Sequence, residues 1–170
     1  MASVPRLREW SRLGERERTI IRRFAEEAPV RLGALANELG LRVRRATLPP
    51  GISGEIRPDD SAPAGFLIRV NRHEIRERQR FTLAHEIAHY LLHRDQIGDG
   101  LRDDILYRSK LSDRREAEAN RLGAEIVMPL SLVEEAWADY ARYEEEERTA
   151  AVAARLGVSN AAIKIRLGLN

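Results

Sequence analysis

The stretch RFTLAHEIAHYLLH, residues 80–93, decides most of what this chain can fold into. From Phe81 onward it is apolar on nearly every side of a helix, which predicts a buried helix over about residues 75–93. Two histidines and a glutamate lie within this apolar run. Polar side chains are costly to bury unless they have partners, so we expect a ligand or other groups of the fold to hold them.

His85, Glu86 and His89 form the pattern HExxH within that helix. Residues four apart lie one above the other on a helix, so both imidazoles can point at one metal ion. Glu86 sits one residue further round, where it can act as a general base on a water beside the ion. A purely structural role for the two histidines is disfavoured, because a single cation would partner all three side chains. The pattern predicts a zinc-dependent endopeptidase with one Zn²⁺ per chain, although manganese could occupy such a site.

A catalytic zinc site takes three protein ligands and leaves one position for water. The chain contains no cysteine, so the third ligand must be a histidine or a carboxylate. His93 lies about 12 Å along the helix axis from His85, at about 1.5 Å per residue, and is therefore excluded as a ligand to the same ion. We expect it to pack or to form a hydrogen bond at the helix end.

Candidates for the third ligand lie on the next helix, predicted over residues 113–127. Glu116 and Asn120 share a face there, so Glu116 could bind the metal while Asn120 orients a ligand histidine. Glu118 points about 200° away from Glu116, so only one of the two can be the ligand. Glu125, more than two turns further along, is a weaker choice.

Several motifs, taken together, resemble the ImmA/IrrE family of metallopeptidases. They are the run at 80–93, EAEANR at 116–121 and VMP at 127–129, and the resemblance covers roughly residue 30 to the end. It implies that Glu116, which opens the E-x-x-A-N motif, is the third metal ligand. It also implies a protein substrate, in this case a helix-turn-helix transcriptional repressor. Ala88 stands where the family often has Gly, and Leu122-Gly123 replaces Phe-Ala, but neither change removes a ligand.

An oxyanion that develops during peptide hydrolysis needs a donor besides zinc. The sequence offers His73, Tyr90, Tyr107 and His93 for this role. Tyr107 is preferred because it lies in the loop between the two ligand-bearing helices.

The whole pattern predicts an α+β fold in which a small, three-stranded, mainly antiparallel sheet packs against a zincin-type helix core. Residues 1–144 would form the zinc metallopeptidase domain, with an N-terminal helix within 1–28, and residues 145–170 a helix-turn-helix-like segment. Helices are expected at 15–27, 32–39, 75–93, 113–127 and 131–143, and strands at 41–48, 52–58 and 65–70. Ser131 would cap the fifth of these helices, with Glu134 completing a capping box. The strand at 65–70 would be an exposed edge to which a peptide substrate adds.

The 29 Lys and Arg residues nearly balance the 27 Asp and Glu residues in the 170-residue chain, so the charge excess is too weak to indicate nucleic acid binding by itself. The alternative function is a DNA- or repressor-binding regulator with a structural or vestigial metal site. It rests on the 145–170 segment, with Arg155, Lys164 and Arg166, but DNA binding is disfavoured because the last helix is short and carries few basic groups. Without a long apolar run or a signal-peptide core, we expect a cytoplasmic protein that does not enter membranes.

Overall fold

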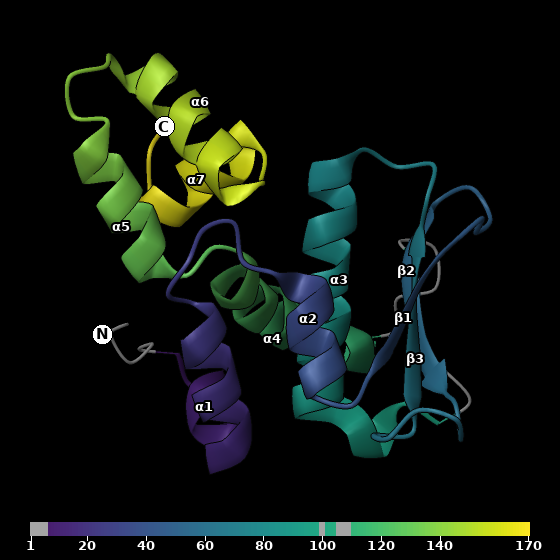
Figure 1. Cartoon of the computed structure of the whole chain (residues 1–170). Coiled ribbons are helices and arrows are strands. Elements are labelled where there is room, and N and C mark those ends of the chain that lie inside the picture. The colour runs from purple at the N-terminus through teal and green to yellow at the C-terminus, as the bar shows by residue number, and fades with distance from the viewer. Residues whose placement is uncertain (1–6, 99–100, 105–109) are drawn as a thin grey trace.

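A computed structural model describes residues 7–98, 101–104 and 110–170 (Figure 1). The elements are the 3₁₀ turns η1 (Glu9–Arg12) and η2 (Arg94–Gln96), the helices α1 (Glu15–Phe24), α2 (Leu32–Glu38), α3 (Arg76–His93), α4 (Lys110–Val127), α5 (Leu130–Asp139), α6 (Glu145–Leu156) and α7 (Asn160–Leu167), and the strands β1 (Arg42–Ala46), β2 (Ile52–Pro58), β3 (Phe66–Asn71) and β4 (Leu101–Asp104). The predicted α+β class, with a small sheet on a helical core, is confirmed. No helix in the described ranges is both long and apolar enough to cross a membrane.

The four strands form one mixed sheet in the order β1-β3-β2-β4. β1 runs parallel to β3, whereas β2 is antiparallel to both β3 and β4, so most of the pairings are antiparallel as predicted. β4 is a short strand that was not predicted from the sequence.

The prediction that residues 65–70 form an exposed edge is wrong. Ile68, in the middle of β3, pairs with Val43 on one side and with Ile56 on the other, and it is completely buried. The apolar run of this strand therefore reflects an inner position in the sheet. Within the described chain, β1 and β4 are the outer strands.

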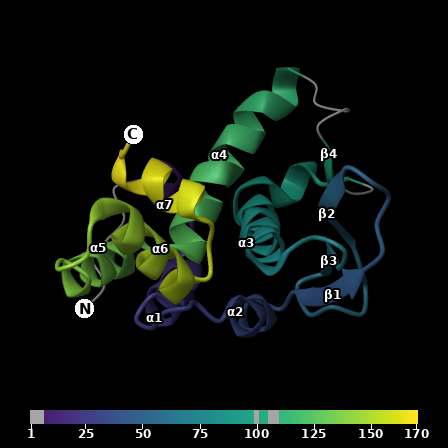
Figure 2. The ribbon, with the colours of Figure 1, turned by 90° about the horizontal axis from the view of Figure 1, so that it is seen from above.

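Helix α3 lies between the sheet and α4, which explains why it is apolar nearly all round (Figures 1 and 2). Two glycines allow the close approach on its two sides. A Cβ added to Gly54 of β2 would lie 2.4 Å from Cγ2 of Thr82, and one added to Gly123 of α4 would lie 3.1 Å from Cα of His85. Any larger side chain at either position would push α3 away from its neighbour.

Helix ends differ from the predictions in several places. α1 ends at Phe24, three residues before the predicted end. α5 begins at Leu130 with Pro129 as its N-cap, so Ser131 lies inside the helix and its predicted capping role is wrong. Proline is tolerated at this position because the backbone N–H groups at a helix start have no partner within the helix, so its missing N–H costs no hydrogen bond there.

The C-terminal helix-turn-helix-like segment is present and packs on the rest of the chain. Gly157 ends α6 in the left-handed conformation (φ 68°), and the hydroxyl of Ser159 accepts a hydrogen bond from the backbone N–H of Ala162 (3.1 Å). Leu156 and Ile163 are fully buried in the core shared with α3 and α4. The boundary proposed between residues 144 and 145 stays a prediction.

Candidate metal centre

Three side chains converge on one point between α3 and α4. His85 and His89 of α3 bring their Nε2 atoms to 3.1 Å from each other. Glu116 of α4 places Oε2 3.0 Å from Nε2 of His85 and Oε1 3.0 Å from Nε2 of His89. These three residues are the group of donors, within the described residues, whose ligand atoms lie close enough to share an ion.

The donor geometry fits a zinc ion. Two ligand atoms bound at about 2.0–2.1 Å to a tetrahedral ion lie about 3.3 Å apart, close to the separations seen between these nitrogens and oxygens. Two imidazoles and one carboxylate are also a donor set that catalytic zinc sites use. His85 and His89 are 3% and 2% exposed, so their nitrogens are poorly hydrated and an ion at this point would satisfy them.

The electrostatics of the site favour the protonation states that bind metal. Burial raises the pKa of Glu116, but hydrogen bonds from His85 and His89 outweigh it, and the net pKa is well below the ordinary value. Burial lowers the pKa of His89, and this effect exceeds the opposing contribution of Glu116. At neutral pH Glu116 is therefore ionised and His89 is neutral, as ligation requires.

Glu86 lies beside this cluster without being part of it. It belongs to α3, is 1% exposed, and faces β2, where a Cβ on Gly54 would lie 3.6 Å from its Oε1. Because Gly54 has no side chain, the strand leaves room for the Glu86 carboxylate. The pattern HExxH thus places two candidate donors beside one separate buried carboxylate. The catalytic role of Glu86 stays a prediction.

His93 and Glu118 form a second pair behind the donors. The Nδ1 of His93 lies 3.0 Å from Nδ1 of His89, and its Nε2 lies 2.8 Å from Oε2 of Glu118. Glu118 is held in turn by Arg12 (3.0 Å) and Arg114 (3.2 Å). The expected hydrogen-bonding role of His93 is confirmed, whereas its partner Glu118 and the reach of Arg12 from the N-terminal region were not predicted.

If a metal ion takes the place of the hydrogen bond between Nε2 of His89 and Glu116, the contacts behind His89 fit the following arrangement of protons. A carboxylate only accepts hydrogen bonds, so Nε2–H of His93 donates to Glu118 and Nδ1 of His93 is an acceptor. Nδ1–H of His89 then donates to His93, which leaves the lone pair of His89 Nε2 for a metal ion. The buried pair therefore selects the tautomer of a metal ligand.

The remaining predicted site residues take different positions. Asn120 is exposed on α4, one turn after Glu116, and its role in orienting a ligand stays a prediction. Tyr107 lies outside the described residues, so its role as oxyanion donor also stays a prediction. His73 is exposed and shares a hydrogen bond with Thr47 (3.0 Å). The hydroxyl of Tyr90 accepts one from Arg94 (3.3 Å).

Two imidazoles from a buried helix and a carboxylate from the following helix form a His₂Glu donor set that could hold one metal ion. A family described as the IrrE N-terminal-like domain (Peptidase_M78) matches residues 36–168. The match covers most of the chain, which therefore belongs to this family of metallopeptidases. The resemblance found in the sequence is thereby confirmed. No curated protein matches the chain.

Proposed function

We propose that this protein is a zinc-dependent endopeptidase in which Glu86 is the general base. The observation that carries the proposal is the convergence of His85, His89 and Glu116 beside a buried glutamate that is not one of the three donors. Membership of the metallopeptidase family supports the same reading.

A zinc ion held by these three side chains would polarise the scissile carbonyl and lower the pKa of a bound water to about 7. Glu86 accepts a proton from the attacking water and passes it to the amine nitrogen as the peptide C–N bond breaks. His93 and Glu118 keep the ring of His89 in its ligating orientation. Burial of the carboxylate between α3 and β2 shields this proton transfer from bulk water.

The proposed substrate is an extended segment of another protein, and we infer from the family resemblance that this protein is a helix-turn-helix transcriptional repressor. β4, rather than β3, is the outer strand next to β2, whose Gly54 borders Glu86. An extended segment could add to β4 as a further strand near this carboxylate.

The regulator alternative receives less support from the C-terminal segment. Lys164 lies 2.6 Å from Glu146, Arg155 lies 2.6 Å from Asp139, and Arg166 pairs with Glu125. Basic residues that are already paired with acids contribute little to binding phosphates. Their arrangement favours a packing role for α6 and α7.

The test replaces the base while keeping the metal ligands. Wild type, Glu86→Gln and the control Glu134→Gln, an exposed acid on α5, would each be co-expressed with a candidate helix-turn-helix repressor from the same genome. Repressor length would be followed by gel and mass spectrometry, and zinc content measured on each purified protein. We expect Glu86→Gln to keep its zinc and to cleave about 10²–10⁴-fold more slowly, whereas Glu134→Gln matches the wild type.

One outcome would contradict the proposed hydrolysis. If zinc-loaded Glu86→Gln relieves repression as well as the wild type does, with the repressor intact in both cases, binding rather than hydrolysis is the function.

A further inference from the structure

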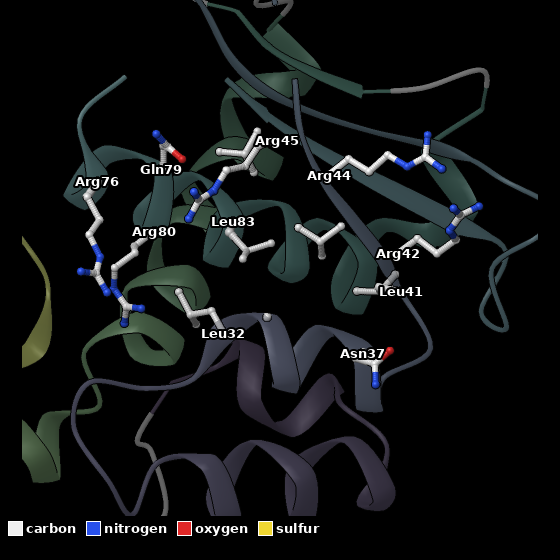
Figure 3. Close-up of a pocket in the computed structure, with 13 residues that line it drawn as sticks. Leu32, Asn37, Leu41, Arg42, Arg44, Arg45, Arg76, Gln79, Arg80 and Leu83 are labelled. Atoms are coloured by element: carbon white, nitrogen blue, oxygen red, sulfur yellow. The ribbon is translucent and has the colours of Figure 1, made fainter. Parts of the chain in front are cut away.

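A basic groove of about 610 Å³ lies between α2, β1 and the first half of α3 (Figure 3). Five arginines line it: Arg42, Arg44, Arg45, Arg76 and Arg80. Among the described residues that line the groove, none is acidic, although acids and bases are nearly balanced over the chain. Leucine side chains from α2 and α3 lie between the arginines and give the groove an apolar floor.

Three of these arginines form no hydrogen bond or salt bridge with the described residues, although Arg44 is close enough to Asp59 to help lower the pKa of that carboxyl. The side chains of Arg44, Arg45 and Arg76 are exposed and form neither hydrogen bonds nor salt bridges with described residues. Arg80 is different, because it donates hydrogen bonds to the backbone carbonyls of Val30 (2.9 Å) and Gly157 (3.1 Å). Arg76 and Arg80 lie together at one end of the groove, and Arg45 points toward that end (Figure 3).

The wall formed by β1 is an open sheet edge. β1 pairs with β3 on one side only, so its other side has no strand partner, and the backbone carbonyl of Arg45 accepts a hydrogen bond from the side chain of Arg72 (3.0 Å). Successive side chains of a strand point to opposite faces of the sheet, which places Arg45 on one face and Arg44 on the other. A ligand that meets both must run along the strand edge, with its own side chains alternating between the two faces.

We propose that this groove binds an extended acidic peptide segment, which adds to β1 as a further strand and pairs its carboxylates with Arg44, Arg45 and Arg76. Backbone hydrogen bonds to an edge strand supply affinity without sequence preference, and the arginines supply the selection for acidic side chains. The apolar floor suits aliphatic residues placed between the acids.

A nucleic acid fits these features less well. Proteins that bind single strands stack the bases on aromatic side chains, and no aromatic residue is among those that line the groove. A phosphate backbone would also gain nothing from an open strand edge or from buried leucines. The groove and the metal centre use different residues of α3, so this binding is independent of the proposed peptidase activity.

The experiment measures binding by fluorescence anisotropy with a labelled peptide of about eight residues in which pairs of glutamates alternate with pairs of valines, so that carboxylates lie on both faces of the added strand. The double variant Arg45→Gln/Arg76→Gln is compared with the wild type and with Arg8→Gln/Arg142→Gln, which removes two exposed charges elsewhere. We expect the groove variant to bind about tenfold more weakly and the control to change less than about twofold. A peptide with glutamine in place of glutamate, and one with alternate backbone nitrogens methylated, should both lose binding.

Two results would overturn the proposal. One is equal loss of peptide binding in the groove variant and the control. The other is tighter binding of a single-stranded oligonucleotide that depends on Arg45 and Arg76, which would make the groove a nucleic-acid site. Zinc removal should leave peptide binding unchanged, so the result stands whether or not the chain cleaves a protein.

Discussion

Glu116 and Glu118 lie two residues apart on α4 and serve different histidines. Glu116 lies 3.0 Å from both His85 and His89, whereas Glu118 lies 2.8 Å from His93. The helix turns the two carboxylates to different sides, one toward the metal donors and the other toward the residue behind them. The two glutamates carry the same carboxylate group, but they contact different histidines and so are expected to have different roles.

The first prediction concerns which acid binds the metal. Alanine at His85, His89 or Glu116 should abolish stoichiometric zinc binding, because each removes one of three protein donors. Metal analysis after dialysis provides the measurement. Glu118→Gln serves as the matched control and should retain about one zinc per chain. Loss of zinc in Glu118→Gln with retention in Glu116→Ala would show that the assignment of the two acids is wrong.

The second prediction concerns His93 as a positioning residue. His93→Phe should weaken zinc affinity about 10–100-fold without changing the stoichiometry at saturating metal, because His89 loses the acceptor for its Nδ1–H. Competition with a chromophoric chelator measures the affinity, and the absorption spectrum of the Co²⁺ form reports the ligand geometry.

Two further variants separate positioning from packing around His93. His93→Gln offers an acceptor in place of the imidazole and should recover part of the affinity. His73→Phe changes an exposed histidine and should have no effect. Unchanged affinity and an unchanged cobalt spectrum in His93→Phe would mean that His93 only fills space.

The third prediction concerns the close approach of β2 and α3. Gly54→Ala places a methyl group 2.4 Å from Cγ2 of Thr82 and 3.6 Å from Oε1 of Glu86, so the strand or the helix must move. We expect the variant to lose about 1–3 kcal/mol of unfolding free energy and most of its peptidase activity. Gly33→Ala, where the added methyl group has no neighbour within 4 Å, should be neutral or slightly stabilising. Urea unfolding of the two variants compares them directly, and equal stability would contradict the steric argument.

The fourth prediction concerns the stability of the folded protein at low pH. Burial raises the pKa of Glu118, but its contacts with His93 and Arg12 outweigh this and lower the pKa to about 2. A carboxyl whose pKa is lowered in the folded state stabilises the protein above its ordinary pKa, and that stabilisation is lost as the pH falls toward about 2. Metal-free Glu118→Gln should therefore lose less unfolding free energy than the wild type between about pH 5 and pH 3. Parallel slopes for the two proteins in urea titrations would be evidence against this contribution.

Local patterns in the sequence were sufficient for the parts of the site that lie on one element. His85 and His89 share a helix face because four residues make about one turn, and the apolar run around them predicts burial before any fold is known. Gly157 and Ser159 likewise mark the turn between α6 and α7, because a left-handed residue and an N-cap act within a few residues.

Contacts between distant segments were decided only by the tertiary structure. Three features join residues that are far apart in the chain. They are the inner position of β3 in the sheet, the pairing of Glu118 with His93 and Arg12, and the arginine groove beside β1. The periodicity of a strand predicts which of its faces is buried but not which strands pair with it. An inner strand and a buried edge strand can therefore have the same sequence pattern. Similarly, the apolar pattern of a helix predicts which side chains point inward. The residues that those side chains contact depend on how the helices pack.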